Sequence, residues 1–531
     1  MASPNETDNI LKGEKLILDK TKNAKKGIVS GIVNKVITLL IPFFVRTLFI
    51  RVIGIEYAGL NSLFTSILQV LNLAELGFAS AVVYCMYKPI AERDDCTICA
   101  LLNFYRRVYK IVGLVVLGAG ILSLPFIKFF INGNPPEDIN LYVVYLVFLF
   151  NTSISYLLYG YKTSLLNAYQ RTYVIDNISS ITTLGLNVAH IVVLLIVPNY
   201  YLYVVFLPIF TIINNLIVSY TVDKMYPQYK CKGTITTDIR KDLWKRIIGL
   251  AIQRVCIMTR NSLQSILLSA FISLSIVGIY NNYFMILTAL TGVISVISTS
   301  MLAGVGNTIQ TQTIEQNFQS MRKFNLLYMW IGAYASICLT ALFQPFMELW
   351  MGKDLMLPLS SVLLLGLYFY NLKLGDISTV YYSAAGLWWY GKWRAIIEAV
   401  ANLVLTLIFI QLWGVNGVLI ATLIVHFFVN IIYGMSILFQ HYFGYKYIWI
   451  FYGSLIFYMI TTIVAFALSY FLCVKIEEML SVDNLWLILG ERLLICSIFS
   501  NLVLFLFYFK TPDYKWALSW VKTCLIKTSI K

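Results

Sequence analysis

From residue 28 to residue 509 the chain alternates between long apolar stretches and short polar connections. The stretches are about twenty residues or longer and do not alternate residue by residue, so each is long enough to cross a bilayer as a helix. A transmembrane β-barrel is excluded, because its strands would alternate. The pattern predicts fourteen transmembrane helices, near residues 28–52, 58–87, 108–131, 141–164, 174–197, 200–222, 247–272, 275–306, 324–350, 358–386, 395–413, 415–439, 447–474 and 486–509.

The first apolar stretch, residues 27–53, is echoed 219 positions later at residues 246–272. Under the same shift, Gly59 in the second predicted helix coincides with Gly278 in the eighth. This echo predicts two six-helix lobes that are parallel repeats, related by a pseudo-two-fold axis along the membrane normal around a central cavity. The last two helices lie outside the repeat.

The most polar internal segment supplies the predicted lobe boundary, since it holds Pro227, Gly233 and a Thr-rich stretch. The predicted organisation is a cytoplasmic N-terminal tail at 1–27, an N-lobe at 28–222, a cytoplasmic inter-lobe loop at 223–246, a C-lobe at 247–440, and the last two helices with a cytoplasmic C-terminal tail at 441–531.

Composition agrees with an all-α polytopic membrane protein, because 59% of the 531 residues are hydrophobic and only 12% are charged. The net charge of +15 does not indicate a nucleic-acid partner, since the basic residues lie in short loops between apolar spans. The predicted cytoplasmic segments hold 30 of the 40 lysines and arginines, which places both termini inside. The first 26 residues are polar, so we expect a cytoplasmic tail and no cleaved signal peptide.

Motifs for catalysis or cofactor binding are not found. The nine cysteines are scattered, which argues against a disulfide framework, and the pair Cys96 and Cys99 lacks the second ligand pair of a metal site. The sequence holds no phosphate-binding loop and no HExxH motif, so we expect neither a resident metal nor direct use of ATP. The short predicted outer loops disfavour a membrane enzyme that polymerises sugars outside the cell.

Cations within the predicted spans are the main candidate binding residues. Lys35 and Arg254 occupy equivalent positions in the two repeats, about two turns inside the membrane. A cation at the centre of a transmembrane helix costs roughly 2.5–3.5 kcal/mol, so the duplication predicts a positive cavity between the lobes. The alternative is that each cation reaches the nearby cytoplasmic surface along its aliphatic chain.

Further polar residues follow helical faces. Arg46 shares a face with Lys35 near the outer end of the first helix, where contact with the membrane surface is an equal alternative. In the echo, Asn261 lies on the stripe of Arg254, whereas Arg260 lies on a second stripe about 120° away. These residues form the predicted cation set and its polar surroundings.

The second and tenth predicted helices add other candidates. Asn61, Asn72 and Glu75 lie on one face of the second helix, and Glu75 has no acidic counterpart in the repeat. It is a candidate to pair with a cavity cation or to bind a coupling ion, and an ion pair with a neighbouring helix is an equal alternative. Lys373 and Asp376 are three residues apart in the tenth helix, so they can neutralise each other, and we interpret them first as a structural pair.

Aromatic residues make up 15% of the chain. Tyrosines occur beside asparagines in and near the spans, as at Tyr280 to Tyr283. Aromatic faces with amides suit sugar rings, although helix packing and the interfacial belt are the better explanation of any single residue.

One region resembles a known family. The residues are Gly59-Leu60, then Leu73-Ala74-Glu75-Leu76-Gly77-Phe78, then Tyr87-Lys88-Pro89-Ile90-Ala91-Glu92-Arg93-Asp94, leading into Tyr105-Arg106-Arg107. They are similar to bacterial polysaccharide transporters of the Wzx type, the flippases for O-antigen and capsule repeat units in the multidrug/oligosaccharidyl-lipid/polysaccharide exporter superfamily. The motif content lies within residues 26–115, and span order and the echo extend the likeness over most of the chain.

The resemblance implies a fourteen-helix fold with a central cavity that alternates its access between the two sides of the cell's inner membrane. It implies movement of an undecaprenyl-diphosphate-linked oligosaccharide from the inner to the outer leaflet, with Na⁺ or H⁺ as coupling ion and no other cofactor. Lys35 and Arg254, then Arg46 and Arg260, would face the diphosphate; Lys35 is not an arginine, so a two-pronged grip on phosphate is not expected there. A polysaccharide polymerase and glycosyltransferases of the same pathway are the implied partners, besides membrane lipids.

Other functions remain open at this point. A multidrug exporter would use the same architecture, but organic cations require acidic residues in the cavity. A membrane glycosyltransferase or polymerase, and a membrane scaffold without transport activity, are the remaining hypotheses.

Overall fold

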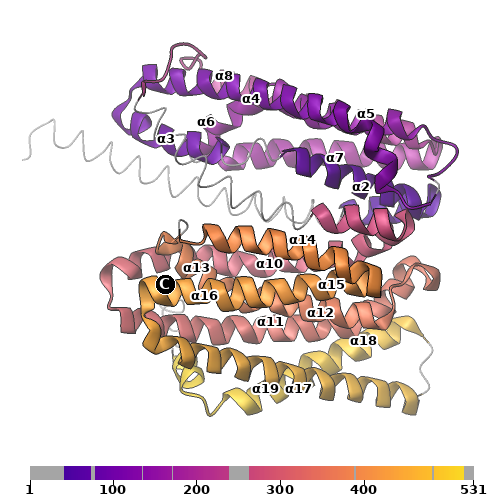
Figure 1. Ribbon diagram of the computed structural model, residues 1–531, viewed down its shortest axis with the longest axis vertical. Coiled ribbons are helices and arrows are strands. Elements are labelled where there is room, and N and C mark those ends of the chain that lie inside the picture. The colour runs from indigo at the N-terminus through magenta and orange to yellow at the C-terminus, as the bar shows by residue number, and fades with distance from the viewer. Residues whose placement is uncertain are drawn as a thin grey trace, which may run out of the picture. The chain divides into compact units, whose positions relative to one another are not determined.

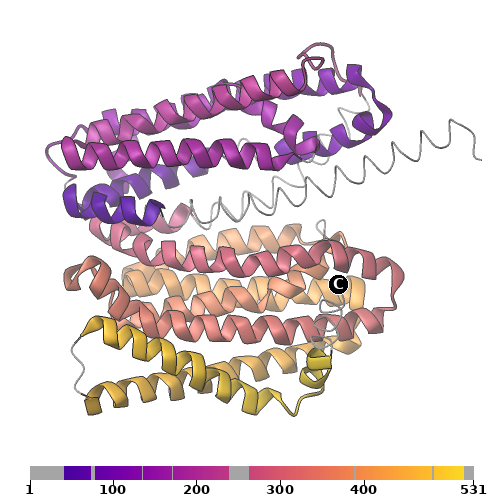
Figure 2. The same cartoon turned by 180° about the vertical axis from the view of Figure 1, so that it is seen from behind.

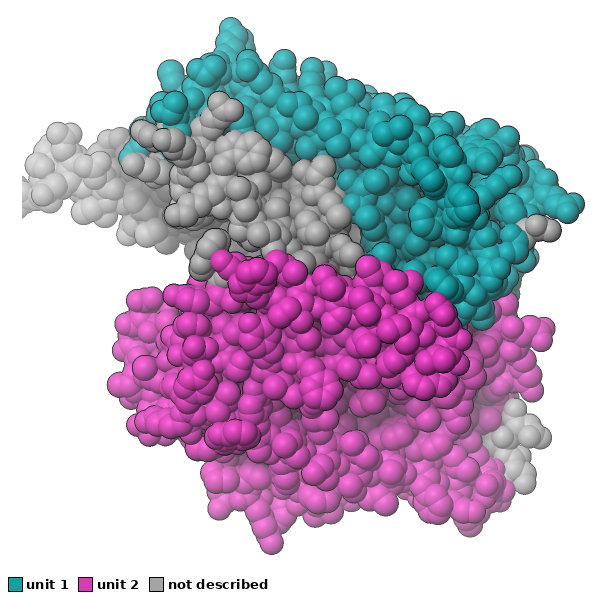
Figure 3. Space-filling model, viewed as in Figure 1, with its two compact units in different colours: residues 1–278 teal, residues 279–531 magenta. Residues whose placement is uncertain are grey.

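The computed structural model describes residues 41–72, 78–133, 135–169, 171–237, 262–387, 390–480 and 484–519. Every regular element in these ranges is a helix, as Figures 1 and 2 show from two sides. The chain forms two compact units, Met1–Gly278 and Ile279–Lys531, which Figure 3 colours separately. The lobe boundaries inferred from the sequence stay a prediction, because residues 238–261 lie outside the described ranges.

The first unit is a bundle of helices. In chain order they are a helix at residues 41–52, α2 (Ile55–Leu71), α3 (Phe78–Glu92), α4 (Asp95–Ser123), α5 (Leu141–Leu157), α6 (Thr163–Ala168), α7 (Thr172–Ile196), α8 (Tyr200–Met225) and a helix at Ser262–Phe271. Single 3₁₀ segments follow α4 at Leu124–Phe130 and α5 at Gly160–Lys162. The helix α5 packs against both α4 and α8, and α8 packs in turn against α7.

The second unit is built around α11, which is buried along most of its length. Its helices are α10 (Leu274–Thr311, whose first turn belongs to the first unit), α11 (Ile314–Met351), α12 (Leu359–Leu374), α13 (Asp376–Ala384), α14 (Lys392–Trp413), α15 (Val415–Val425), α16 (Gly434–Leu438), α17 (Ile448–Leu480), α18 (Leu485–Ile495) and α19 (Asn501–Tyr508). Three π-helical segments join neighbouring helices, at His426–Tyr433, Phe439–Phe443 and Cys496–Ser500, and 3₁₀ turns lie at Lys353–Leu355 and Tyr445–Tyr447. The helix α11 contacts α12, α17 and α18, and α12 contacts α15, which packs on α14.

Nine helices in the described part of the chain are long and apolar enough to cross a membrane. The bent pair Leu141–Leu157 and Gly160–Ala168 makes ten if its two helices form one broken span. Large apolar side chains face outwards from these helices, and Leu195 and Ile196 of α7 are 67% and 72% exposed, which a lipid environment explains. The protein is therefore an all-helical, multi-pass membrane protein, as the sequence predicts, while the count of fourteen helices stays a prediction.

Polar side chains define several helix starts. Asp94 precedes α4 and accepts hydrogen bonds from the Thr97 amide at 3.0 Å and from the Thr97 hydroxyl. These bonds hold the pKa of the Asp94 carboxyl below its usual range. Thr313 and Gln316 form a reciprocal capping box at the start of α11. The connections between helices are thus fixed by local chemistry as well as by the end of the apolar stretch.

The helix α5 is broken near its end. Its axis turns by 47° into the segment Gly160–Ala168, and Tyr159 at the bend adopts a left-handed conformation with φ of 56°. A Cβ atom at Gly160 would lie 2.6 Å from the Ser155 carbonyl oxygen, so only glycine fits the bend. The 219-residue shift carries Tyr156, three residues before the bend, onto Gly375, where α12 stops and α13 starts. The fourth helix of each repeat is therefore interrupted at a corresponding place.

The first turns of α2 and α10 meet through a pair of equivalent glycines. A Cβ atom at Gly59 would lie 2.1 Å from the Leu274 carbonyl oxygen, and one at Gly278 would lie 2.6 Å from the Ile55 carbonyl oxygen. The two contacts are exchanged by the 219-residue shift. The Ser275 hydroxyl and the Glu56 carboxylate, also 219 residues apart, are hydrogen-bonded beside them at 3.4 Å. The sequence echo thus corresponds to a reciprocal contact of two backbones.

This contact predicts that neither glycine tolerates a side chain. We expect Gly59→Ala to destabilise the protein by about 1–3 kcal/mol, the usual range for overpacking, because the backbone oxygen of Leu274 cannot move aside as a side chain would. The measurement is the unfolding temperature in detergent, followed by size-exclusion chromatography. Gly118→Ala is the control, since Gly118 in α4 has no atom within 4 Å of the added carbon. Equal unfolding temperatures for the two variants would contradict the close approach.

Candidate functional site

A buried ion pair lies inside the second unit. Lys373, near the end of α12, is 1% exposed, and no other lysine or arginine in the described ranges is as deeply buried. Its Nζ lies 2.7 Å from Oδ2 of Asp376 and 5.9 Å from the ring centroid of Tyr328. A buried ammonium group is tolerable only when it is paired and hydrogen-bonded, and this arrangement supplies the pairing.

The break between α12 and α13 positions the acidic partner. Gly375 ends α12, so Asp376 occupies the first turn of α13, where the helix dipole favours a carboxylate. The hydroxyl of Tyr328, from α11, donates to the same carboxylate oxygen that Lys373 contacts. Lys373 comes close to α11 because Gly332 has no side chain; a Cβ atom there would lie 3.1 Å from Cβ of Lys373. Three helix segments therefore meet at one charge-balanced cluster, Lys373–Asp376–Tyr328.

A pocket of about 580 Å³ adjoins this cluster. Tyr328 belongs to both, since its hydroxyl reaches Asp376 while the residue also lines the pocket. The walls come from α10, α11 and α13, and none of the described lining residues is charged. Tyr381 of α13 also lines it, and its hydroxyl is buried without a hydrogen-bond partner. The lining residues are Ile297, Ser300, Met301, Gly304, Val305, Thr308, Gln312, Ser320, Phe324, Leu327, Tyr328, Ile331 and Tyr381.

The other described candidates belong to the first unit. The guanidinium of Arg46 donates to the Gly278 carbonyl oxygen at 3.3 Å, so this cation lies at the glycine contact of α2 and α10. The Asn61 side chain accepts a hydrogen bond from the Tyr200 hydroxyl at 2.8 Å, which ties α2 to α8. Asn72 follows the last residue of α2, and its side-chain oxygen is buried without a hydrogen-bond partner.

Five predicted site residues lie outside the described residues. They are Lys35, Glu75, Arg254, Arg260 and Asn261. Their roles stay predictions, and so does the positive cavity that Lys35 and Arg254 imply. The structure brings together Lys373 and Asp376, as the spacing predicts, and adds Tyr328 to them.

Ion pairs between distant parts of the chain were not foreseen. Arg492 of α18 makes two bonds to the Glu477 carboxylate of α17, at 2.6 and 2.9 Å, and a third to the Ala341 carbonyl oxygen of α11 at 2.8 Å. Arg492 lies near the start of the last predicted span, where the apolar pattern indicates no ion-pair partner, and its side chain is only 12% exposed. The helix α17 continues past the predicted span and includes Glu477. An acidic residue in this polar extension of an apolar helix is the sequence feature that could have indicated a partner for Arg492.

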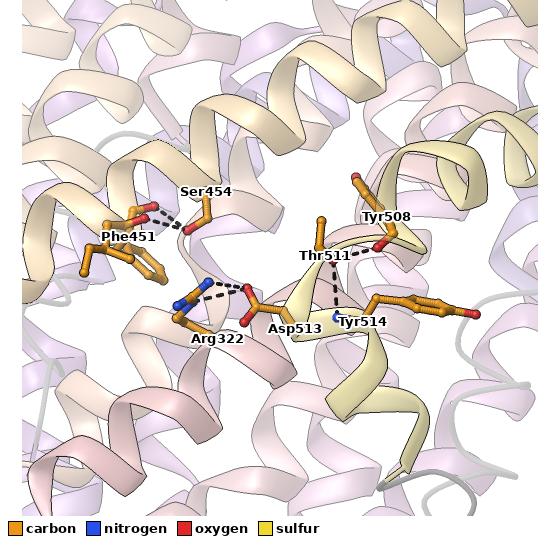
Figure 4. Close-up of polar contacts among 8 residues, drawn as sticks. Arg322, Phe451, Ser454, Tyr508, Thr511, Asp513 and Tyr514 are labelled. Carbon is orange, nitrogen blue, oxygen red and sulfur yellow. Dashed lines mark hydrogen bonds and ion pairs between the residues drawn. The ribbon is translucent and has the colours of Figure 1, made fainter.

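A second distant pair fixes the C-terminal segment. Figure 4 shows Arg322 of α11 directed at Asp513, which follows α19; the closest N–O distance is 2.8 Å. Thr511 ends the preceding turn by donating to the Tyr508 carbonyl oxygen at 2.6 Å. In the first unit, Lys162 beside the α5 bend pairs with Asp223 at 2.6 Å. Cations near helix ends are thus neutralised by acids far away in sequence.

Comparison with known proteins places the chain in a family. The profile of a family described as polysaccharide biosynthesis protein matches residues 24–302, more than half of the chain. The chain belongs to the polysaccharide biosynthesis protein family. Comparison with curated protein sequences finds no match.

Solved structures agree with this family assignment in fold. A structure described as lipid II flippase MurJ in an inward closed conformation is similar with a TM-score of 0.64 and 17% identity, over 90% of this chain and 98% of that one. An inward-facing multidrug resistance MATE family transporter of the MOP superfamily is similar with a TM-score of 0.60 and 14% identity, over 76% and 94%. A Vibrio cholerae MATE transporter is similar with a TM-score of 0.54 and 14% identity, over 78% of this chain and 96% of that one. This member of the polysaccharide biosynthesis family therefore has the fold of the superfamily named in the sequence analysis.

Substitutions in the cluster Lys373–Asp376–Tyr328 can test whether the ion pair stabilises the fold or is needed for transport. We expect Lys373→Met to destabilise this polysaccharide biosynthesis family member by about 1–3 kcal/mol, less than the roughly 3–5 kcal/mol of a fully buried pair, because it leaves the Asp376 carboxylate, whose side chain is 28% exposed, without its cation. Thermal unfolding in detergent measures the effect.

The double variant Lys373→Met with Asp376→Leu removes both charges and is the matched control. We expect it to recover most of the lost stability, since no charge is left unpaired. If the double variant is as unstable as the single one, the pair is not what holds α12 and α13 in place. If it is stable and transport is nevertheless lost, the pair has a role in transport.

Proposed function

We propose that the protein is a flippase that moves an undecaprenyl-diphosphate-linked oligosaccharide repeat unit from the inner to the outer leaflet of the cytoplasmic membrane. The observation that carries the proposal is the family match, which joins polysaccharide biosynthesis to a chain with a transporter fold. A polysaccharide made from a cytoplasmic lipid-linked unit requires a step that carries the unit across the membrane. O-antigen, capsule and exopolysaccharide units are the substrates of this class.

The charges of the chain fit a diphosphate substrate. A diphosphate that enters a low-dielectric site requires cations, and charge-assisted hydrogen bonds are the strong ones. Lys35 and Arg254 are the proposed contacts in the two repeats, with Arg46 and Arg260 as secondary ones. Arg46 would have to exchange its present bond to the Gly278 carbonyl for a phosphate oxygen.

Coupling and partners form the second part of the proposal. A Na⁺ or H⁺ gradient is the proposed source of energy, with Glu75, Asn72, Asn61, Asn261, Lys373 and Asp376 as candidate polar groups. A polymerase would receive the translocated unit, and glycosyltransferases would supply it on the cytoplasmic side, where both termini are proposed to lie.

A multidrug exporter is the second candidate, favoured by the likeness to MATE transporters. The content of charged residues argues against it. The predicted first and seventh helices, residues 28–52 and 247–272, contain lysine and arginine but no aspartate or glutamate. Organic cations would be repelled by such helices, whereas an anionic lipid would be attracted.

The experiment measures the rate at which a fluorescent undecaprenyl-diphosphate oligosaccharide crosses the bilayer of proteoliposomes that contain the protein. We expect the double variant Lys35→Ala with Arg254→Ala to insert normally and to slow translocation at least about tenfold, which corresponds to losing about 1.4 kcal/mol of substrate stabilisation. The matched control is Lys128→Ala with Lys353→Ala, which removes two exposed cations from other parts of the chain.

Each outcome has a definite meaning. If the Lys35 and Arg254 variant moves the lipid as fast as wild type, these cations are structural and the site assignment is wrong. If the control variant is equally slow, the effect is one of total charge. If wild type moves no lipid with several saccharides and with either ion gradient, but exports organic cations, the flippase proposal fails and the exporter is correct.

A further inference from the structure

The pocket between α10, α11 and α13 has walls that change character along its length. At the end near Gln312, which follows α10, the walls include Thr308 and Ser320. Farther along the same helices they are Ile297, Met301, Leu327 and Ile331. The pocket therefore has a polar end at the hairpin between α10 and α11, and an apolar end farther from it.

The hydroxyl groups in the apolar part do not change this description. The Ser300 hydroxyl donates to the Ile297 carbonyl oxygen of its own helix at 2.8 Å. The Thr308 hydroxyl likewise donates to the Val305 carbonyl oxygen at 3.0 Å, so the polar character of the hairpin end comes from Gln312 and Ser320. The Tyr328 hydroxyl is used by Asp376, so this residue offers its ring to the pocket. The described wall contains no lysine, arginine, aspartate or glutamate, which makes it a poor place for a diphosphate.

The pocket extends along α10 from the level expected for lipid headgroups to the level expected for their hydrocarbon chains. From Gln312 to Ile297 the helix rises about 22 Å at 1.5 Å per residue, out of about 57 Å for the whole of α10. The hairpin end precedes Arg322 and Lys323, the cations that place it on the cytoplasmic side. The polar end then lies at the level of the headgroups, and the apolar end lies at the level of the hydrocarbon.

The pocket is also accessible. Ile297 and Ile331, on the two long helices, are each 39% exposed. Gly304 lines the same pocket two turns after Ile297 along α10, and a Cβ atom there would meet nothing within 4 Å. An open apolar space of this volume can accept a flexible hydrocarbon chain.

We propose that this pocket binds the isoprenoid chain of the lipid-linked substrate, over the segment next to its charged headgroup. The inference rests on the proposed flippase function and extends it, because it separates the site for the chain from the cations proposed for the diphosphate. An inner-leaflet lipid has its headgroup towards the cytoplasm and its chain towards the midplane, which is the direction in which the pocket changes from polar to apolar. Burial of the chain supplies binding energy that does not depend on the saccharide.

Gly304 offers a direct test. Gly304→Leu fills the pocket with a branched side chain and raises helix propensity, so a loss of binding would not come from a weakened helix. The probe is a photoreactive long-chain polyprenyl phosphate, added to the full-length protein in nanodiscs, and the readout is the yield of cross-linked protein with the labelled peptides mapped. We expect labelling on α10 and α11 in the wild type, and about tenfold weaker binding in Gly304→Leu, the change that corresponds to about 1.4 kcal/mol.

Gly306→Leu is the matched control. Gly306 is on the same helix, has nothing within 4 Å of an added Cβ, and is absent from the described pocket lining. At 100° per residue it points about 200° away from Gly304. If Gly304→Leu does not fold, Gly304→Val fills less of the space and takes its place. Undiminished labelling in a folded Gly304 variant, or equal loss in both leucine variants, overturns the proposal.

Two further arms distinguish other occupants. A photoreactive phospholipid that labels the same peptides and competes equally would show a general acyl-chain groove, which overturns the isoprenoid assignment. Tyr381→Phe removes the hydroxyl that has no partner. We expect it to leave labelling unchanged, whereas a saccharide in the pocket would use that hydroxyl, so reduced binding of a lipid-linked saccharide by this variant also overturns the assignment.

The test is separable from the proposed function. Cross-linking reports binding without transport. If wild-type protein moves no lipid in proteoliposomes but is still labelled in a manner that Gly304→Leu abolishes, the pocket assignment stands and the flippase proposal falls. If the lipid moves and labelling is absent from α10 and α11, the pocket assignment falls alone.

Discussion

A charge inside a membrane has to be neutralised, and the described bundle is organised by that constraint. Lys373 is neutralised by Asp376 and Arg492 by Glu477, and Arg492 also donates to the Ala341 carbonyl oxygen. The first pair joins α12 and α13 next to α11, and the second joins α17 and α18 to α11. Because a lone charge at either place would cost several kcal/mol, each pair also fixes the packing of the helices that carry it. The central helix α11 takes part in both.

The need to neutralise charge in the membrane also distinguishes two kinds of predicted span, those that contain an acidic partner for their cations and those that do not. Asp376 accompanies Lys373 in one predicted span, so that span carries its own counter-charge. The predicted spans at 28–52 and 247–272 hold five lysines and arginines and no acidic residue. Arg46, from the first of these, donates to the Gly278 carbonyl oxygen. The diphosphate headgroup of the proposed substrate would supply an anion for the cations of these two spans, in keeping with the family assignment.

Hydropathy predicts the class of the fold and the centres of its helices, but not their ends or bends. The predicted span 447–474 corresponds to Ile448–Leu480, because the helix continues through Lys475 and Glu477 after the apolar residues stop. Glu477 is stabilised there by Arg492, which the sequence pattern cannot show. The bend at Tyr159 was also missed, since it depends on the contact of Gly160 with the Ser155 carbonyl oxygen. Tyr328 joins Asp376 from 48 residues away, a separation at which no helical periodicity applies.

Comparison of the two halves shows which features are duplicated. The glycine contacts Gly59 with Leu274 and Gly278 with Ile55 are exchanged by the 219-residue shift, so the repeat in the sequence predicts a real approach of two backbones. Two charges of the described ion pairs do not follow the shift: Lys373 falls on Ile154, and Lys162 falls on Tyr381, which lines the pocket. Packing is therefore common to both halves, whereas the described charge clusters belong to one half each.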